Sequence, residues 1–384
     1  MAAHDCSGGR SGRNGPLVPG TGCRVVSASG RFSASESPFR RCLLGCYCPG
    51  MSPPCDQHRS ALICGITGQD GCYLAAHLLG LGYRVVGTSR EASPERLTGL
   101  RRLGIEQRVV IEPASLAEAE PLVTLIERER PRAIFHLAGQ SSVAVSFDRP
   151  AETFESIATS TLLLLEAVRT ATNPPRLFVA GSSEIFGTRQ TAPVTCRSRL
   201  DPQNPYALAK TTAFRIVQQY RREHGLFACT GVLFNHDSPL RPARFVTQKI
   251  VAGACAIAAG RQQELRLGDL SMERDWGWAP EYVVAMEQML SRDTPEDFIL
   301  ATGRPHRLEE FVALAFAAVG LDWRDHVVRD ERFVRPHDGS HPLASVTETT
   351  ERLGWTATVQ LPELVQRMVT ARQLDDAARF TRAA

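Results

Sequence analysis

The sequence predicts an α/β protein with a doubly wound parallel sheet and a smaller, mixed C-terminal lobe. From Ser60 onward, short apolar runs alternate with helix-length amphipathic segments, a rhythm typical of a parallel sheet covered by helices. The first apolar run ends in three glycines at three-residue spacing, over residues 61–71, as a strand turning sharply into a helix does. After Pro239 these signals become shorter and less regular. Together they indicate a Rossmann-type domain followed by a second lobe.

Composition at the N-terminus separates residues 1–58 from the rest. They are rich in Gly, Pro, Ser and Arg and show no sustained period of 2 or 3.6, so we expect a disordered extension. Met51 is a candidate start, and residues 1–50 are expected to be dispensable. Three further regions follow: a Rossmann-type dinucleotide-binding domain over 59–240, a lobe over 241–375 that is partly interleaved with it, and a tail over 376–384.

Charge and cysteine usage exclude several classes of protein. The 384 residues carry a net charge of +3, but seven arginines lie in the first 60 residues, so the remainder is nearly neutral. This excludes a basic nucleic-acid surface, and no apolar run approaches the roughly 20 residues of a membrane span. Cysteines outside that segment are scattered in apolar or loop contexts. Within it, a metal site is the alternative at Cys42, Cys46, Cys48 and Cys55, but their spacing lacks a zinc-finger rhythm and no histidine lies among them. We therefore expect reduced thiols, no metal site and a cytoplasmic location.

The glycine turn is the first candidate binding site. Gly65 permits the turn, Gly68 allows close approach of a diphosphate, and Gly71 lets the next helix, over 72–79, pack on the strand. The N–H groups at the start of that helix then face the phosphates. A glycine-rich turn without a ligand is the alternative.

The alternation of segments predicts six strands, at Ala61–Ile66, Arg84–Thr88, Val109–Glu112, Ala133–Leu137, Arg176–Ala180 and Ala228–Phe234. It predicts further helices at Leu116–Arg128, Phe154–Thr170 and Tyr206–His224. The residues after the second strand read the adenosine ribose of a dinucleotide. An arginine there suits a 2′-phosphate and an acid suits a free 2′-hydroxyl, and the chain offers both, as Arg90 and Glu91. An exposed ion pair without a ligand is the alternative.

A tyrosine and a lysine four residues apart indicate acid–base chemistry. Tyr206 and Lys210 share one face of a predicted helix, and a nearby ammonium can lower the pKa of a phenol and make it a base for an alcohol. Ser182 follows the fifth strand, where it is expected beside that phenol, and Glu184 lies two residues further. The alternative is a chance helical spacing, against which the glycine turn and the Ser-Ser-Glu run argue together.

From Ala61 to about Arg372 the chain resembles the GDP-mannose 4,6-dehydratase family of extended short-chain dehydrogenases. The segments that carry the resemblance are GITGQDG at 65–71, LAGQSSV at 137–143, GSSEIFG at 181–187, NPYALAK at 204–210, LFNHDSP at 233–239, FVTQKI at 245–250 and RDWGWAPEYV at 274–283.

This resemblance implies a dehydration by way of a transient ketone. Tyr206, assisted by Lys210 and Ser182, would take the proton of the C4 hydroxyl of GDP-mannose while C4 gives its hydride to the cofactor. Glu184 would then remove the acidified C5 proton as general base, and water would leave from C6. The hydride would return to C6, giving GDP-4-keto-6-deoxymannose.

The resemblance also implies the binding residues, with NADP favoured over NAD. The cofactor contacts are Gly65, Ile66, Thr67, Gly68, Gln69, Asp70, Gly71, Arg90, Ser115, Leu116, Leu137, Ala138, Gly139, Gln140, Ser141, Lys210, His236 and Arg241. The substrate contacts are Ser183, Asn235, Lys249, Arg274 and Arg335. The chain departs from the family pattern at Glu91, at Ser115 and over 333–350.

Two other readings stay open. A nucleotide-sugar reductase or epimerase of the same fold would use Tyr206 and Lys210 but would have no need of Glu184. A catalytically silent protein that keeps the cofactor as a sensor is the alternative from another class. We expect a nucleotide sugar as partner and a homo-oligomer, either dimer or tetramer, without nucleic acid or membrane.

Overall fold

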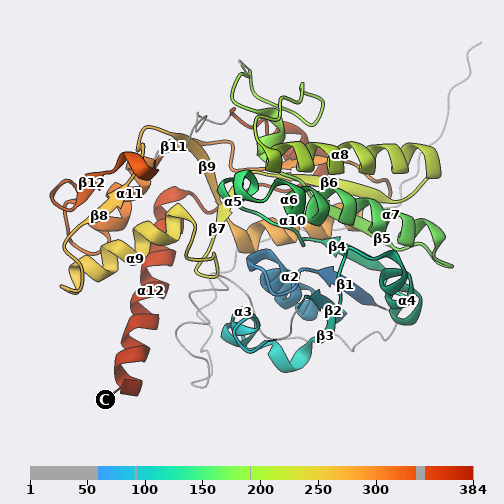
Figure 1. Ribbon diagram of the computed structural model, residues 1–384, viewed down its shortest axis with the longest axis horizontal. Coiled ribbons are helices and arrows are strands. Elements are labelled where there is room, and N and C mark those ends of the chain that lie inside the picture. Colours follow the sequence, from blue (N-terminus) through green and yellow to red (C-terminus); the bar gives the residue numbers. More distant parts are fainter. Residues whose placement is uncertain (1–58, 91–92, 191, 334–341, 384) are drawn as a thin grey trace, which may run out of the picture. The chain divides into compact units, whose positions relative to one another are not determined.

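Seven parallel strands form the central sheet of the computed structural model (Figure 1). They are β1 (Ser60–Cys64), β2 (Arg84–Ser89), β3 (Val110–Pro113), β4 (Ala133–His136), β5 (Arg176–Ala180), β6 (Ala228–Leu233) and β10 (Phe298–Leu300). Their order is β10-β6-β5-β4-β1-β2-β3, and every neighbouring pair is parallel. The chain order reverses between β1 and β4, which is the switch point where doubly wound folds bind their ligands. The predicted fold class is confirmed.

The structure describes residues 59–90, 93–190, 192–333 and 342–383. All of these belong to one compact unit. The predicted N-terminal extension, Glu91 and Arg335 lie outside the described residues.

Helices cover both faces of the sheet. They are α2 (Gln69–Gly80), α3 (Thr98–Arg102), α4 (Ala119–Glu129), α5 (Val143–Asp148), α6 (Pro150–Phe154), α7 (Ser160–Thr170), α8 (Pro205–His224) and α10 (Ala279–Ser291). Short helical turns lie at Glu106–Arg108, Glu155–Thr159 and, as η3, at Ser183–Phe186. Alternate residues of β1 point to opposite faces, so Ile63 packs with α2 and α10, and Leu62 packs with α4 and α7.

Two differences from the predicted elements have physical reasons. The six predicted strands are present to within two residues, but β10 was not predicted, because three apolar residues in an irregular region give no period. Its pairing with β6 returns the chain to the large sheet after the second lobe has begun. The predicted helix over 154–170 contains a π-helical turn at Glu155–Thr159, a feature that helical periodicity does not reveal.

In its described residues, the smaller lobe has two small sheets and three helices. The sheets have the orders β11-β9-β7 and β12-β8, with β7 (Asn235–Asp237), β8 (Leu265–Leu267), β9 (Glu273–Trp278), β11 (Pro305–Arg307) and β12 (Val327–Arg329). The helices are α9 (Val246–Ala258), α11 (Leu308–Ala317) and α12 (Leu361–Ala383), with short turns at Trp323–Asp325, Thr349–Leu353 and, as η5, at Glu331–Phe333. Residues 376–383, assigned above to a tail, continue α12.

Two buried tryptophans help to form the core of this lobe. Trp276 and Trp278 are 2% and 1% exposed, and the ring of Trp276 lies 5.6 Å from that of Phe311. The same apolar cluster joins α9, α11 and α12. The lobe therefore has a core of its own.

Candidate active site

The glycine turn has the conformation that its spacing predicts. Gly65 has φ +89°, and a Cβ atom on Gly71 would lie 2.3 Å from the carbonyl oxygen of Gly65. Gly68 precedes α2 and brings no side chain to cap it, so the first N–H groups of that helix are left for a ligand. This cradle fits the diphosphate of a dinucleotide.

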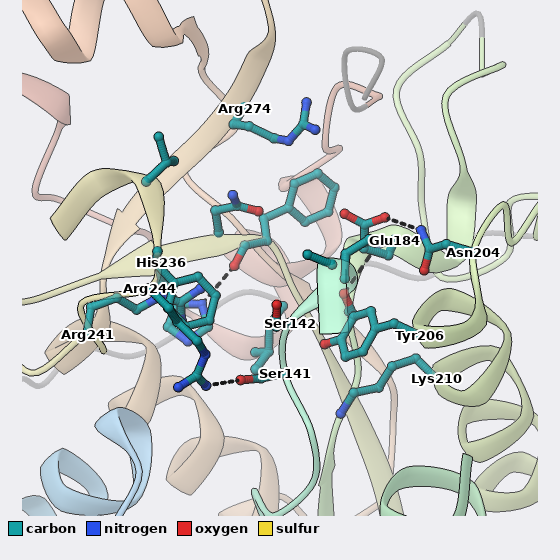
Figure 2. A pocket seen from close by; sticks show the side chains of 18 of the residues that line it. Ser141, Ser142, Glu184, Asn204, Tyr206, Lys210, His236, Arg241, Arg244 and Arg274 are labelled. Carbon is teal, nitrogen blue, oxygen red and sulfur yellow. Dashed lines mark hydrogen bonds between the residues drawn. The ribbon is translucent and has the colours of Figure 1, made fainter. Parts of the chain in front are cut away.

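The carboxyl ends of β1, β4, β5 and β6 meet around a cavity of about 640 Å³ (Figure 2). Fifteen of the residues predicted for the site line it: Asp70, Leu137, Ala138, Gly139, Gln140, Ser141, Ser182, Glu184, Tyr206, Lys210, Asn235, His236, Arg241, Lys249 and Arg274. Parallel strands bring their carboxyl ends to one edge of the sheet, which is why segments far apart in the sequence converge here.

The other predicted residues lie outside the wall of this cavity. The rest of the glycine turn, Arg90 and the pair Ser115-Leu116 follow β1, β2 and β3 at the same edge of the sheet. That is the end at which an adenosine would extend from α2. Ser183 is 2% exposed within η3 and does not line the cavity, so its burial argues against the predicted substrate contact.

The start of α8 positions Tyr206 and Lys210. Asn204 caps this helix through the backbone N–H of Ala207 and Pro205 takes its first position, so the four-residue spacing places both side chains on the cavity face. Lys210 Nζ donates to the carbonyl oxygen of Ala180 at 2.7 Å and lies 5.9 Å from the centre of the Tyr206 ring. The ammonium is thus fixed between the helix and the end of β5.

The acidities of this pair differ from the sequence prediction. Burial raises the pKa of Tyr206 to about 12, a hydrogen bond with Ser182 lowers it, and the charge of Glu184 raises it. Burial also lowers the pKa of Lys210 to about 8. In the protein alone the phenol pKa is therefore raised and not lowered as expected, because desolvation of the phenol outweighs the influences that lower it.

Glu184 faces the cavity from η3, directly after β5. The hydroxyl of Ser182 caps this turn and accepts from the backbone N–H of Glu184 at 3.3 Å. The amide of Asn204 donates from Nδ2 to Glu184 Oε2 at 3.1 Å (Figure 2). Asn204 was not among the predicted site residues, although an asparagine directly before Pro205 is an N-cap signal that could have drawn attention to it.

The imidazole of His236 joins β7 to the first turn of α2. Its Nδ1 donates to the carbonyl oxygen of Phe234 at 2.7 Å, and its Nε2 lies 3.0 Å from Asp70 Oδ2. Burial alone would lower the pKa of His236, but the charge and hydrogen bond of Asp70 outweigh burial and raise it. Both ring nitrogens thus have protein partners. This favours a role for His236 in holding the glycine turn in place over direct contact of its ring with the cofactor.

Cationic side chains form the wall of the cavity opposite η3 and α8. The guanidinium carbons of Arg241 and Arg244 lie 3.7 and 4.9 Å from the centre of the Phe245 ring, and Arg244 Nη2 donates to Ser141 Oγ at 3.4 Å. Arg244 was not predicted, although it lies only three residues after Arg241 in the same segment. A pair of guanidinium groups beside an aromatic ring suits a phosphate-bearing ligand.

Two predicted substrate residues on this wall differ in their partners. Lys249 Nζ donates to the carbonyl oxygen of Arg266 at 2.7 Å and lies 3.6 Å from the centre of the Phe333 ring. Arg274 is 8% exposed on β9, and its Nη1 donates to the carbonyl oxygen of Glu273 at 2.8 Å. Figure 2 shows the Arg274 guanidinium on the side of the cavity opposite Lys210.

Comparison with known proteins assigns the family. The sequence profile of the family described as GDP-mannose 4,6 dehydratase matches residues 62–368. The chain belongs to this family. GDP-mannose 4,6 dehydratase 2 of Arabidopsis thaliana is 40% identical over 82% of this chain and 87% of its own length. The human GDP-mannose 4,6 dehydratase is 37% identical over 81% of this chain and 90% of its own length.

Solved structures support the fold of the dehydratase family. The dTDP-glucose 4,6-dehydratase of Streptomyces venezuelae, solved with NAD, matches with a TM-score of 0.72 at 19% identity, over 83% of this chain and 98% of its own. UDP-glucose 4-epimerase of Thermotoga maritima matches with a TM-score of 0.73 at 21% identity, over 82% and 99%. Within the described residues, no helix is long and apolar enough to cross a membrane, and no cluster of potential metal ligands occurs.

Proposed function

We propose that this chain is a hydro-lyase that converts GDP-α-D-mannose into GDP-4-keto-6-deoxy-D-mannose and water. The observation that carries the proposal is the presence of Glu184 in one cavity with Ser182, Tyr206 and Lys210. A nucleotide-sugar reductase or epimerase needs the tyrosine and lysine but has no step for an added carboxylate base. Membership of the dehydratase family supports the choice of substrate.

Each side chain has a distinct task in this reaction. Tyr206 takes the proton of the sugar C4 hydroxyl, with Ser182 bonded to the phenol and Lys210 supplying a fixed positive charge. A nicotinamide dinucleotide held by the glycine turn and Arg241 would supply reversible hydride transfer for C4 and C6, and the positive charge of its oxidised ring would favour the tyrosinate form. Glu184 removes the proton from C5, which the C4 ketone acidifies. The C6 hydroxyl then leaves as water with one of the two protons that Tyr206 and Glu184 have taken up, and the other proton returns to C5.

NADP is the proposed cofactor, bound along the carboxyl edge of β1, β2 and β4. The exposed guanidinium of Arg90 follows β2, where it suits a 2′-phosphate. The first turn of α2 would hold the diphosphate, and Arg241 would face it from the other lobe. We infer in addition a cytoplasmic homo-oligomer, as the sequence composition and the resemblance suggest.

The test of this function separates redox chemistry from dehydration. The purified protein, given NADP and GDP-mannose, should form a nucleotide sugar lighter by one water, identified by mass spectrometry. Glu184→Gln keeps the shape of the side chain and removes the base. That variant should accumulate reduced cofactor, seen by its absorbance, and should lose both the product and the exchange of the C5 hydrogen in deuterated water.

Tyr206→Phe is the matched control, because it should suppress the reduced-cofactor signal itself. General acid–base groups typically contribute about 10² to 10⁴ in rate, so turnover should fall by roughly that range in both variants. Dehydration by Glu184→Gln at near the parent rate would show that another group acts at C5. A parent that oxidises or epimerises the sugar without losing water would favour the reductase or epimerase, and one that only binds cofactor would favour the sensor.

A further inference from the structure

One side-chain amide links the start of α8 to the carboxylate of Glu184. Asn204 Oδ1 accepts from the backbone N–H of Ala207 at 2.8 Å, and Asn204 Nδ2 donates to Glu184 Oε2 at 3.1 Å (Figure 2). The helix that this residue caps also carries Tyr206, two positions further along. The same amide therefore contacts both the helix of the proposed C4 base and the side chain of the proposed C5 base.

The helix cap decides which end of the amide faces Glu184. The backbone N–H of Ala207 can only donate, so the amide oxygen of Asn204 must point towards it. This leaves the NH₂ group for the carboxylate, and an NH₂ group can only donate. A donor at this position stabilises the ionised form of Glu184 over the protonated form, because the protonated acid has less charge to accept the bond.

We propose that Asn204 is a positioning residue for the C5 base: it orients the Glu184 carboxylate relative to Tyr206 and keeps it deprotonated. The inference rests on the proposed function, in which Glu184 acts at C5. An oriented carboxylate loses little conformational freedom on reaching the transition state, which is how a residue that touches no reacting atom can raise a rate.

The charged groups around Glu184 come from several elements. Tyr206 on α8 interacts electrostatically with it, and Lys210 lies one helical turn beyond. Arg274 on β9 lines the same cavity. Asp201 lies before the start of α8, and its carboxylate accepts a hydrogen bond from the side-chain amide of Gln203. A substitution at Asn204 leaves all of these charges in place, so a change in the titration of Glu184 reports the loss of the amide.

Two substitutions separate the cap from the bond to Glu184. Asn204→Ser keeps a good N-cap but is too short to reach the carboxylate, whereas Asn204→Ala removes both contacts. For Asn204→Ser we expect an unfolding temperature close to that of the parent. The acid limb of its dehydration pH profile, which reports the pKa of Glu184, should move up by about one pH unit. On that limb its turnover should be roughly tenfold lower than that of the parent at the same pH. Asn204→Asp keeps the cap, adds a second carboxylate and should move the limb further in the same direction.

A second measurement does not depend on turnover. The pKa of Glu184 can be followed by the ¹³C shift of its side-chain carboxyl in protein labelled at glutamate, with Glu184→Gln to assign the signal. That pKa should rise in Asn204→Ser and rise further in Asn204→Asp. In stopped-flow experiments with substrate, reduced cofactor should build up more in Asn204→Ser than in the parent, because the step after C4 oxidation is the one that slows.

A merely structural role for Asn204 predicts a different pattern. Asn204→Ser would then match the parent in pH profile and Glu184 titration, and Asn204→Ala would lose activity only in proportion to its stability. Either result for Asn204→Ser overturns the inference. A parent that fails to dehydrate GDP-mannose would refute the proposed function instead, and the carboxyl titration would still decide whether Asn204 holds Glu184.

Discussion

The two walls of the cavity hold their functional side chains in different ways. On the wall formed by η3 and α8, Lys210 donates to a backbone carbonyl and Glu184 is bonded to a helix cap. On the opposite wall, formed by residues 241–249, β9 and η5, cations lie on aromatic rings, with Arg241 over Phe245 at 3.7 Å and Lys249 over Phe333 at 3.6 Å. A hydrogen bond to backbone or to a cap fixes the direction of a group, whereas a contact with a ring face does not. Lys249 has both kinds of contact, because its Nζ also donates to the carbonyl oxygen of Arg266.

This difference matches what the two walls have to do. Proton transfer needs reacting atoms at about 3 Å with fixed direction, so the catalytic wall requires rigid support. A wall that holds a charged nucleotide needs positive charge in the right region, and its side chains can adjust as the ligand enters. We therefore expect substitutions on the catalytic wall to lower kcat and those on the opposite wall to raise KM.

The largest effect should come from Lys210→Met, which keeps the stem of the side chain and removes its charge. Turnover should fall by about 10² to 10⁴, since the tyrosinate loses a fixed counter-charge. The same variant should be more stable than the parent at neutral pH. Lys210 is 9% exposed and burial lowers its pKa to about 8, so its ionised form destabilises the folded protein.

The pH dependence of that stability has a definite sign. Because the pKa of Lys210 is lower in the folded than in the unfolded chain, the unfolded chain binds more protons between about pH 8 and 10.5. The destabilisation of the folded protein by the Lys210 charge is at its full value below pH 8 and disappears as the pH rises through this window. The gain in Lys210→Met, about 1–3 kcal/mol in unfolding free energy, should therefore shrink towards pH 10.5. Denaturant titrations of both proteins across the window measure it, and a constant difference would contradict the burial argument.

The sequence predicted the catalytic wall better than the opposite one, for physical reasons. Local spacing places Tyr206 and Lys210 on one helical face, and strand ends bring Ser182 and Glu184 to the same edge of the sheet. The bond from Arg244 to Ser141 joins residues 103 positions apart, and no local period reveals such a contact. The prediction that the pKa of Tyr206 is lowered was wrong, because desolvation raises this pKa and depends on burial by the whole fold, which local spacing does not give.

On the opposite wall, substitutions at Arg274 and Lys249 should differ in their effect on substrate binding, although both residues were predicted to bind the substrate. Arg274→Ala should raise KM for GDP-mannose by about 10²-fold, because a buried guanidinium forms strong bonds to a diphosphate. Lys249→Met should raise it by about tenfold or less, because this ammonium already donates to Arg266 and lies on Phe333. Steady-state kinetics and calorimetric binding of GDP to each variant measure the two effects. Equal losses would mean that Lys249 leaves its protein partners to bind the ligand.

The smallest effect should come from the exposed end of the cofactor groove, where Arg90 follows β2 far from the reacting atoms. Arg90→Ala should weaken NADP binding by about tenfold and leave NAD binding nearly unchanged, because an exposed arginine contributes about 1 kcal/mol to a 2′-phosphate. The measurement is titration of both cofactors into the cofactor-free parent and variant. Since the enzyme returns its hydride in every cycle, kcat at saturating cofactor should not change. Tighter binding of NAD than NADP by the parent would show that Glu91 reads the ribose, and Glu91→Arg should then reverse the preference.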